Sequence, residues 1–401
     1  MRTTWTFHSA GQMVFGPGAL AQLDSAAAPL SLRRALIVSD PILQRLGMID
    51  QVLNPLRRAQ IECQVFAESE PEPSLAVAER CVAFARPFQP DAIVGLGGGS
   101  NLDLAKIVAT VLAHGGAARD YIGDGAIPGP VLPIIAIPTT AGTGSEVTAA
   151  AVLTDAENQM KVGVLSNFLR PRLAIVDPLL TLTCPAKVTA DSGIDALTHA
   201  IEAFTAVDNE TFPLPSGQST VYQGRHPFGN LFAEKAIELV GRFLVRAVRK
   251  GDDLEARSGM ALAATMGGLA FSNVGVALVH AMEYPVGGAV HCSHGLGNGL
   301  LLPYVMRFNL PSRKKEFARI AQLLGEDVAR ISDSAGAEQA IRTIEWLKRE
   351  CGIPERLREI GVTAEQLPQF AEKASSIQRI LRVNPRPVST ADCLAIYQAA
   401  Y

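Results

Sequence analysis

The first half of the chain alternates short β-branched runs with stretches of helical periodicity, and this alternation restricts the fold more than any other feature. Buried strands are predicted at residues 35–40, 61–66, 91–96, 131–138 and 173–177, with a hairpin at 149–154 and 161–165. Helices are predicted over 42–55, over 75–87 and from residue 101 onward. Strands that alternate with helices in this way are typical of a parallel sheet with helices on both faces. We expect the strand at 173–177 to close that sheet.

The pattern changes near residues 178–186, where prolines and threonines interrupt both periods. Beyond this point only helical periodicity is found, over 188–204, 231–249, 254–271, 278–286, 315–324, 335–351 and 364–374. A chain of 401 residues is also longer than a typical single core. We therefore predict an α/β N-terminal Rossmann-like domain at residues 1–183 and an all-α C-terminal domain at 184–401.

Composition excludes several classes of function. The chain is 48% hydrophobic and 19% charged, which suits a compact protein with a large interior, and its net charge of −3 gives no basic footprint for nucleic acid. No apolar run reaches the ~18 to 20 residues that span a bilayer, and the N-terminus lacks the apolar core of a signal peptide. The six cysteines are scattered without a CxxC pair, which predicts reduced thiols in a cytoplasmic protein.

Two glycine-rich loops follow predicted strands. Gly97-Gly-Gly-Ser100 lies between a strand and a helix, where glycines let the backbone approach a pyrophosphate and the helix N-terminus supplies N–H groups. Thr139-Thr-Ala-Gly-Thr-Gly-Ser145 is a second such loop, and ligands of open α/β sheets bind at the carboxyl ends of strands. The first loop is not GxGxxG, and a tight turn without a ligand is the alternative.

Asp40 also ends a predicted strand. An acid at this position favours NAD over NADP, although Asp-Pro is also a common turn.

Four residues of the helical half predict a metal site. Asp195 and His199 lie four residues apart, on one face of a predicted helix, and the alternative for such a pair is a hydrogen bond along that face. His280 and His294 follow in a second apolar, glycine-studded stretch. Three imidazoles and one carboxylate suit Fe, Zn, Ni or Co, and the cation would act as a Lewis acid on a carbonyl or alkoxide. With a nicotinamide cofactor held by the sheet domain, this chemistry is hydride transfer.

The chain resembles the iron-dependent (group III) alcohol dehydrogenase family over nearly its whole length. The stretches that carry the resemblance are GLGGGSNLDLAK at 95–106, IPTTAGTGSEVT at 137–148, GIDALTHAIEAF at 193–204, AFSNVGVALVHAM at 270–282 and HGLGNGLLLPYVM at 294–306. The resemblance implies a Rossmann-like domain joined to an all-helical one, similar to dehydroquinate synthase. It also implies a homodimer or a larger homo-oligomer.

The resemblance assigns roles residue by residue. The implied metal ligands are Asp195, His199, His280 and His294, which hold Fe²⁺ in most members and Zn²⁺ or Ni²⁺ in some. The implied NAD-binding positions are Asp40, Gly97, Gly98, Gly99, Ser100, Asp103, Thr139, Thr140, Thr148 and Lys161. Phe271 matches an aromatic residue near nicotinamide and substrate. The implied catalytic group is therefore His280, Tyr284 and Phe271.

Two positions depart from the family pattern. Tyr284 stands where many members have a second histidine that relays protons, and a tyrosine with a pKa near ~10 exchanges protons less readily at pH 7. His291 nearby could replace that histidine, or could simply be a surface histidine. The loop at 208–230 is longer than is typical, with three prolines and three glycines. We hypothesise that it shapes the substrate entrance, and the alternative is an oligomer contact.

These observations predict an NAD-dependent, metal-dependent alcohol dehydrogenase or aldehyde reductase acting on a small-molecule alcohol or aldehyde. The alternatives are a hydroxyacid–oxoacid transhydrogenase or a maleylacetate reductase-like enzyme, and a non-catalytic protein that keeps the fold. Anionic substrates need a cationic pocket, and the cations near the motifs are few, Arg225 and Lys161. A neutral substrate is therefore favoured. Neither a nucleic acid nor a membrane is an expected partner.

Overall fold

The computed structural model describes residues 2–158, 160–214 and 220–401. The described chain folds into two compact units. The sheet unit contains His8–Thr140 and Gly144–Thr183. The helical unit contains the described part of 184–401 together with two short segments from the first half, residues 2–7 and Ala141–Thr143. The second glycine-rich loop is therefore divided between the units.

The sheet unit is built on a six-stranded sheet in which every paired strand is parallel. In spatial order the strands are β1 (Gln12–Phe15), β9 (Leu173–Val176), β6 (Ile134–Pro138), β4 (Ala92–Gly97), β2 (Arg34–Val38) and β3 (Glu62–Phe66). The prediction that the strand at 173–177 closes the sheet was wrong, because β1 pairs outside it. Sequence patterning did not identify β1, whose four residues are all exposed or half-buried.

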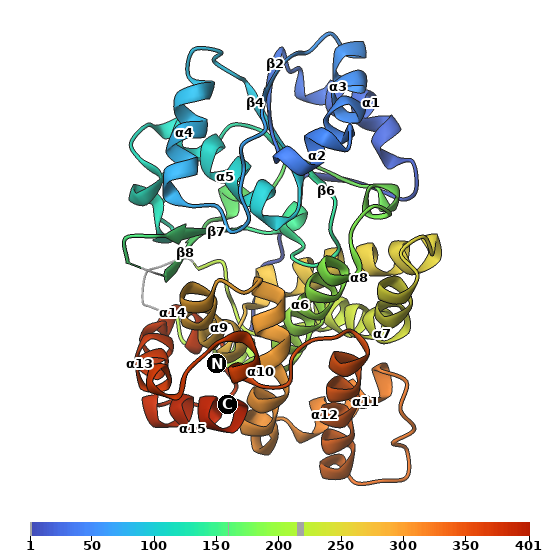
Figure 1. Ribbon diagram of the computed structural model, residues 1–401, viewed down its shortest axis with the longest axis vertical. Helices are drawn as coiled ribbons and strands as arrows, with labels where there is room; N and C mark the ends of the chain where they lie inside the picture. The colour runs from blue at the N-terminus through green and yellow to red at the C-terminus, as the bar shows by residue number, and fades with distance from the viewer. Residues whose placement is uncertain (1, 159, 215–219) are drawn as a thin grey trace. The chain divides into compact units, whose positions relative to one another are not determined.

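Helices cover both faces of this sheet (Figure 1). On one face are α4 (Leu75–Ala85) and α5 (Gly99–His114), and on the other α1 (Leu23–Ala27) and α3 (Met48–Arg58). The helix predicted over 42–55 is interrupted by Gly47 at φ 68°, which separates α2 (Pro41–Arg45) from α3. The two-faced parallel sheet confirms the predicted fold class of this half.

The predicted hairpin is present as β7 (Ala150–Asp155) and β8 (Met160–Leu165), paired antiparallel. A two-residue strand, β5 (Gly123–Asp124), pairs parallel with β8 to complete a separate three-stranded sheet. Short 3-10 helices connect the elements of this unit: Ala19–Gln22, Ala28–Leu30, Ala118–Tyr121, Ser145–Val147, Asn167–Leu169 and Pro178–Thr181.

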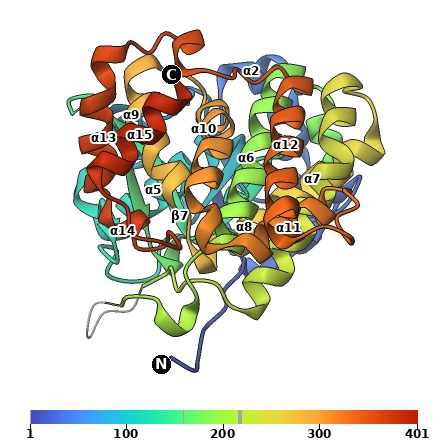
Figure 2. The same ribbon diagram turned by 90° about the horizontal axis from the view of Figure 1, so that it is seen from below.

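The helical unit confirms the all-α prediction for the second half. Its helices are α6 (Ala186–Thr205), α7 (Pro227–Arg249), α8 (Leu254–Val274), α9 (Leu278–Val290), α10 (His294–Asn309), α11 (Lys314–Leu323), α12 (Asp333–Glu350), α13 (Leu367–Ser376), α14 (Gln378–Leu381) and α15 (Thr390–Ala400). Its 3-10 helices are Asn209–Thr211, Leu310–Ser312, Leu357–Ile360 and Ala364–Gln366. Figure 2 shows α6 and α10 side by side, and α6 packs on α7, α8 and α10. Sequence patterning did not predict α10, because three glycines and Pro303 interrupt its helical signal.

The segment at 208–230 is shorter as a loop than predicted, because α7 already begins at Pro227. Its two ends are joined: Asn209 N–H donates to the carbonyl of Arg225 and Arg225 N–H to that of Val207, each at 2.9 Å. The Arg225 guanidinium also pairs with Asp208 and Glu316. Residues 215–219, on which the entrance hypothesis also depends, lie outside the described residues.

None of the helices in the described chain is, by itself, long and apolar enough for a membrane span. Only α8 and α9 taken together meet that criterion, and they are bent by 106°.

Candidate metal and cofactor sites

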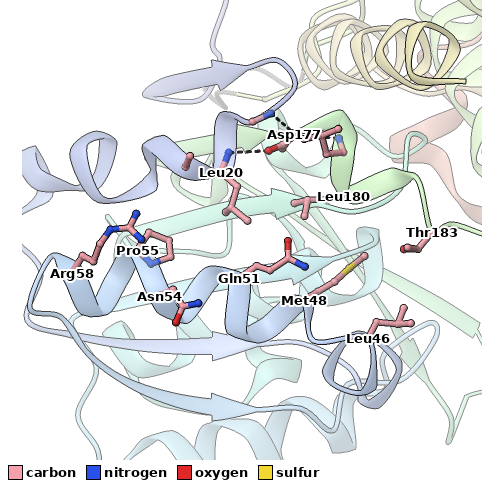
Figure 3. Close-up of a pocket in the computed structure, with 13 residues that line it drawn as sticks. Leu20, Leu46, Met48, Gln51, Asn54, Pro55, Arg58, Asp177, Leu180 and Thr183 are labelled. Atoms are coloured by element: carbon pink, nitrogen blue, oxygen red, sulfur yellow. Dashed lines mark hydrogen bonds between the residues drawn. The ribbon is translucent and has the colours of Figure 1, made fainter. Parts of the chain in front are cut away.

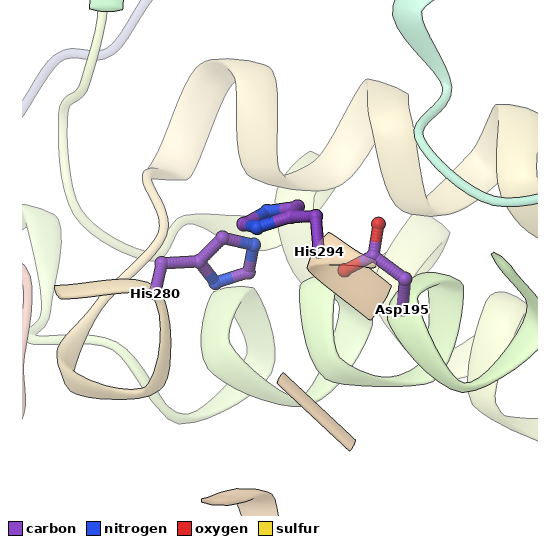
Figure 4. Close-up of side chains that lie close together, drawn as sticks. All are labelled: Asp195, His280 and His294. Carbon is purple, nitrogen blue, oxygen red and sulfur yellow. The ribbon is translucent and has the colours of Figure 1, made fainter. Parts of the chain in front are cut away.

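Asp195, His280 and His294 converge from three helices of the helical unit (Figure 4). One ligand atom of each lies within 4.8 Å of the others, and the three residues belong to α6, α9 and α10 respectively. Asp195 and His280 are each 2% exposed, whereas the His294 side chain is 27% exposed. The fold thus brings together one carboxylate and two imidazoles that lie up to 99 positions apart in the sequence (294 minus 195).

His199 lies one turn along α6 from Asp195, with 3.8 Å between its Nδ1 and Asp195 Oδ2. This nitrogen is buried and has no hydrogen-bond partner among the described residues. The His199 ring stacks on Phe271 at 4.1 Å between centroids and on His280 at 4.7 Å. A buried nitrogen without a partner is costly, so His199 fits the role of an additional donor to a shared cation.

Burial and mutual charge favour the protonation states that metal ligands need. Burial would raise the pKa of Asp195, but the neighbouring His199, His294 and His280 and a hydrogen bond from Asn298 outweigh it and lower that pKa. Burial lowers the pKa of His199 to about 3. An ionised carboxylate beside a neutral imidazole supplies two donors of the kind that a divalent transition-metal site needs.

Two carboxylates that sequence reasoning missed stand behind the histidines. Glu202 accepts a hydrogen bond from His280 Nδ1 at 2.6 Å, and Glu283 accepts one from His294 Nδ1. With Nδ1 donating to a carboxylate, each ring keeps its Nε2 lone pair for the site. The sequence spacing could have identified both glutamates. Glu202 and Glu283 each follow a predicted ligand histidine by three residues and so share its helix face.

Asn298 is a further residue that sequence reasoning missed, four positions after His294 on α10. Its amide nitrogen donates to Asp195 Oδ1 at 2.8 Å and lies 3.2 Å from His280 Nε2 and 3.1 Å from His294 Nε2. The Asp195 carboxylate and the two imidazoles thus direct acceptor atoms toward the same point, which the Asn298 amide nitrogen marks. Acceptors that face a common point are what a cation requires, so the residues present fit a divalent metal.

The other predicted catalytic residues are placed as follows. Phe271 is buried in α8 and lies flat on the His199 ring. Tyr284 is 5% exposed, and its ring centroid lies 6.1 Å from that of His294. His291 is exposed and ends α9 in the left-handed conformation, with φ 53°. The exposed helix-end position favours the surface interpretation of His291.

In the sheet unit, the first glycine-rich loop has the geometry of a phosphate cradle. Helix α5 begins at Gly99 directly after β4, with Gly98 as its N-cap and no capping side chain in the described structure. Gly97 has φ +143°, and a Cβ there would lie 2.0 Å from the Asn101 amide nitrogen, so only glycine fits. The second loop is adjacent, since a Cβ on Gly98 would lie 3.5 Å from Thr140. The free N-terminus of a long helix beside two small-residue loops suits an anionic group.

The Asp40 carboxylate is engaged by the protein. Its Oδ1 caps α2 by accepting from the N–H groups of Ile42 and Leu43, and its Oδ2 accepts from the Asn101 amide at 2.7 Å. The capping turn that the sequence offered as the alternative is therefore present. Because Asn101 also abuts Gly97, the same side chain joins Asp40 to the glycine-rich loop.

Several predicted cofactor residues form a buried network inside the sheet unit. Lys106, which sequence reasoning missed, donates to Ser145 Oγ, to Thr148 Oγ1 and to the Ala150 carbonyl at 2.8–3.0 Å. Asp103 accepts from Ser145 Oγ at 2.6 Å. These bonds fix the end of the second loop against α5.

The remaining predicted cofactor residues also lie in the sheet unit. Thr139 is buried, and its N–H bonds to the Gly97 carbonyl. The Ser100 hydroxyl accepts from the Glu72 N–H. Lys161 is buried and pairs with Glu72 at 2.9 Å.

A cavity of about 470 Å³ lies within the sheet unit (Figure 3). It is bordered by the turns that follow β1 and β9 and by α3 along its length. Its lining is Gly18, Leu20, Ala21, Leu46, Met48, Gln51, Asn54, Pro55, Arg58, Asp177, Leu179, Leu180 and Thr183. Apolar walls with a few amide groups, at the carboxyl ends of parallel strands, are typical of a ligand site in α/β proteins.

Comparison with known proteins gives matches over both halves of the chain. Residues 10–178 match the family model "Iron-containing alcohol dehydrogenase", and residues 220–401 match "Fe-containing alcohol dehydrogenase family, C-terminal". A solved structure described as 1,3-propanediol oxidoreductase superposes with a TM-score of 0.92 at 36% identity, and the match covers 100% of both chains.

Characterised relatives match along almost the full length. Long-chain-alcohol dehydrogenase 1 of Geobacillus thermodenitrificans is 39% identical over 402 residues, which is 98% of this chain and 97% of the relative. NAD-dependent methanol dehydrogenase of Bacillus methanolicus is 37% identical over 387 residues, covering 96% and 97%. A mitochondrial hydroxyacid-oxoacid transhydrogenase of Xenopus tropicalis is 30% identical over 422 residues, covering 100% and 91%.

These matches and the architecture agree. The chain belongs to the iron-containing alcohol dehydrogenase family. It is an oxidoreductase that acts on CH–OH groups.

Proposed function

We propose that this chain is an NAD(H)-dependent alcohol dehydrogenase or aldehyde reductase whose divalent cation is held by Asp195, His199, His280 and His294. The convergence of the ligand atoms of Asp195, His280 and His294, which lie within 4.8 Å of one another, carries the proposal. Fe²⁺ is the proposed cation, with Zn²⁺ or Ni²⁺ as substitutes, since the same donor set serves each. When bound, the cation supplies Lewis acidity at the C–O group of the substrate, and NAD supplies the hydride acceptor.

The residues of the chain prepare this chemistry. Asp195 and the Nε2 atoms of His280 and His294 present lone pairs to the cation, and Phe271 packs on His199 to fix its ring. Tyr284, buried near His294, is proposed to pass the hydroxyl proton of the substrate toward solvent. In the sheet unit, Gly97–Ser100 and the N-terminus of α5 are proposed to bind the pyrophosphate of NAD.

The remaining cofactor contacts are proposed for Asp40, Asp103, Thr139, Thr140, Thr148 and Lys161. Asp40 would favour NAD over NADP, because an acid repels a 2′-phosphate. Asp103 and Thr148 act by holding the second loop through Ser145 and Lys106. The cavity beside β1 and β9 is a candidate for another part of the same ligand.

The two cations that the sequence analysis considered for an anionic substrate are already paired. Arg225 binds Asp208 and Glu316, and Lys161 binds Glu72. This supports a neutral alcohol or aldehyde over a maleylacetate-like diacid. The named relatives act on alcohols that range from methanol to long-chain alcohols, and they support the same substrate class.

A hydroxyacid–oxoacid transhydrogenase is the second candidate. The resemblance to the family suggests that this branch also has a tyrosine at the position of Tyr284, and one relative at 30% identity carries the transhydrogenase name. Relatives named as dehydrogenases are more similar, at 37% and 39% identity. The dehydrogenase therefore remains the first proposal.

A cytoplasmic location and a homodimeric or larger assembly complete the proposal. None of the six cysteines, all of which lie in the described chain, forms a disulfide, which suits a reducing compartment. Size-exclusion chromatography with light scattering would test the assembly, and a monomer at all concentrations would contradict it.

The function is tested on anaerobically purified protein by metal analysis and by turnover of NADH or NADPH with aldehydes and keto acids. We expect stoichiometric iron and NADH-dependent aldehyde reduction, both lost in His280→Ala. His291→Asn is the control: asparagine tolerates the left-handed conformation, so this variant should keep metal and activity. Turnover only with paired hydroxy and oxo acids would favour the transhydrogenase. Absence of both metal and NAD binding would overturn the proposal.

A further inference from the structure

We propose that Glu202 and Glu283 are positioning residues that hold His280 and His294 in their metal-binding orientation, and that the charge of Glu283 raises the affinity of the site for its cation. The inference rests on the proposed metal site and goes beyond it, because neither glutamate is among the proposed ligands. It gives a role to two buried carboxylates that do not themselves bind the proposed cation.

Glu202 is 4% exposed and makes three short polar contacts, two of them with backbone N–H donors. Its carboxylate accepts from the N–H groups of Ala277 and Val279, at 2.8 and 2.6 Å, and from His280 Nδ1 at 2.6 Å. The two backbone N–H donors stabilise the ionised form of this carboxyl group, and an ionised carboxylate can only accept at its third contact. The proton of His280 therefore lies on Nδ1, and Nε2 is left as the acceptor that faces Asp195 and His294.

Glu283, on α9, contacts His294 Nδ1 in the same way that Glu202, on α6, contacts His280 Nδ1. Its side chain is fully buried, and His294 Nδ1 bonds to its Oε2. Glu283 and His280 lie three residues apart on α9, so one helix supplies both a ligand and the orienting partner of another ligand. Gly297 makes this approach feasible, since a Cβ there would lie 2.8 Å from Glu283 Cγ.

The two glutamates differ in what else they support. Glu202 also binds the first N–H groups of α9, so its loss removes a helix cap as well as a histidine partner. The hydrogen bond to His294 is the contact of Glu283 that bears on the metal site. A carboxylate behind an imidazole increases its basicity as a ligand and adds attraction for the cation. Glu283→Gln is therefore the informative variant, because glutamine keeps the shape and an accepting oxygen and removes the charge.

The test uses the full chain after removal of metal with a chelator. Dissociation constants for Co²⁺ are measured by competition with a chromophoric chelator, together with the visible absorption of the bound Co²⁺. We expect Glu283→Gln to bind Co²⁺ about 10- to 100-fold more weakly, with a shifted spectrum and an unchanged Tm of the metal-free protein. Glu202→Gln should show a similar loss and also a lower Tm. Glu345→Gln, on the surface of α12, should match the wild type in every measurement.

Equal affinity and an equal spectrum in Glu283→Gln would overturn the inference. A wild type that binds neither Co²⁺ nor Fe²⁺ would overturn the metal site itself, so the two failures are distinguishable. If Glu283→Gln does not fold, ¹⁵N NMR of the wild-type histidines decides the matter. The inference requires the Nδ1–H tautomer at His280 and His294, and Nε2–H at both would contradict it.

Discussion

The ring of Phe271 lies flat on the ring of His199, with centroids 4.1 Å apart and planes inclined by 14°. This contact fixes the plane of the one predicted ligand that, among the described residues, has no hydrogen bond at its buried Nδ1. The aromatic residue that the family resemblance placed near the substrate therefore also supports a ligand of the proposed metal site.

Replacing Phe271 by leucine keeps an apolar side chain and removes the stacked contact. Because an aromatic pair contributes about 1 kcal/mol beyond its buried area, we expect the dissociation constant for Co²⁺ to rise roughly fivefold. Phe317→Leu, at a buried position of α11, is the matched control for lost packing and should leave metal affinity unchanged. Equal metal affinity in the two variants would show that the stacking does not orient His199.

A substitution at Gly98 tests the phosphate cradle without disturbing the fold. A Cβ at this position meets Thr140 at 3.5 Å, which is an ordinary contact. A bound pyrophosphate would leave no room for this Cβ. Gly98→Ala should therefore raise KM for NAD roughly tenfold or more, with little change in Tm. Gly129→Ala, also in ordinary contact at 3.6 Å, is the control and should keep the wild-type KM. A wild-type KM in Gly98→Ala would place the pyrophosphate elsewhere.

Lys106 is fully buried and donates to acceptors on both sides of the bend between the second loop and β7. Lys106→Met would leave these acceptors and Asp103 without their cation, so we expect a loss of stability on the order of 3 kcal/mol in urea unfolding. KM for NAD should also rise, because Ser145 and Thr148 lose their anchor. Lys235→Met, which removes a surface pair with Glu238, should change stability by less than about 1 kcal/mol. Similar losses in the two variants would contradict the role assigned to Lys106.

His226 makes stability depend on pH. It caps α7 by accepting from Gly229 N–H, stacks on Trp5 at 4.6 Å, and has a buried Nε2 without a partner among the described residues. Burial lowers the pKa of His226 from 6.5 to about 4. Between these values the unfolded chain binds a proton that the folded chain excludes, so the free energy of unfolding falls as pH drops through this window.

His226→Asn keeps a side chain that caps helices well and removes the titrating group. We expect the variant to lose less stability than the wild type between pH 7.5 and pH 4.5, as measured by urea unfolding, although the loss of stacking lowers its stability at both values. Parallel pH profiles for the two proteins would show that His226 does not titrate in this way.

The local periodicity of the sequence was sufficient to predict most of the helices and strands. Apart from β1, the strands of the large sheet have strong patterns of period two or continuous apolar runs, and the helices on either side of α10 have a period of 3.6, so these elements could be predicted from short windows. β1 and α10 could not, because β1 is four partly exposed residues and α10 carries three glycines and a proline. Their structure depends on partners distant in sequence, β9 for the strand and α6 for the helix.

The candidate site was predictable only where chemistry and spacing coincide. Asp195 and His199 share a helix face, and the rarity of histidine made His280 and His294 conspicuous. Glu202, Glu283 and Asn298 were missed because their importance depends on which atom they touch across helix boundaries, and glutamate or asparagine in a helix has no distinctive pattern. Asp40 shows the reverse, since a residue chosen for ligand binding proved to be a helix cap as well.

The short segment Ala141–Thr143 has a consequence for dividing the protein into fragments. It belongs to the helical unit although it lies more than 40 positions before that unit's main segment, and a Cβ on Gly142 would lie 2.6 Å from Ser192 on α6. The Gly142 backbone also acts on His199, since it raises the pKa of this imidazole against the larger lowering effect of burial. A fragment that starts at Cys184 would therefore retain Asp195, His199, His280 and His294 and still lack part of the wall behind them. Metal affinities measured on such a fragment would describe a damaged centre.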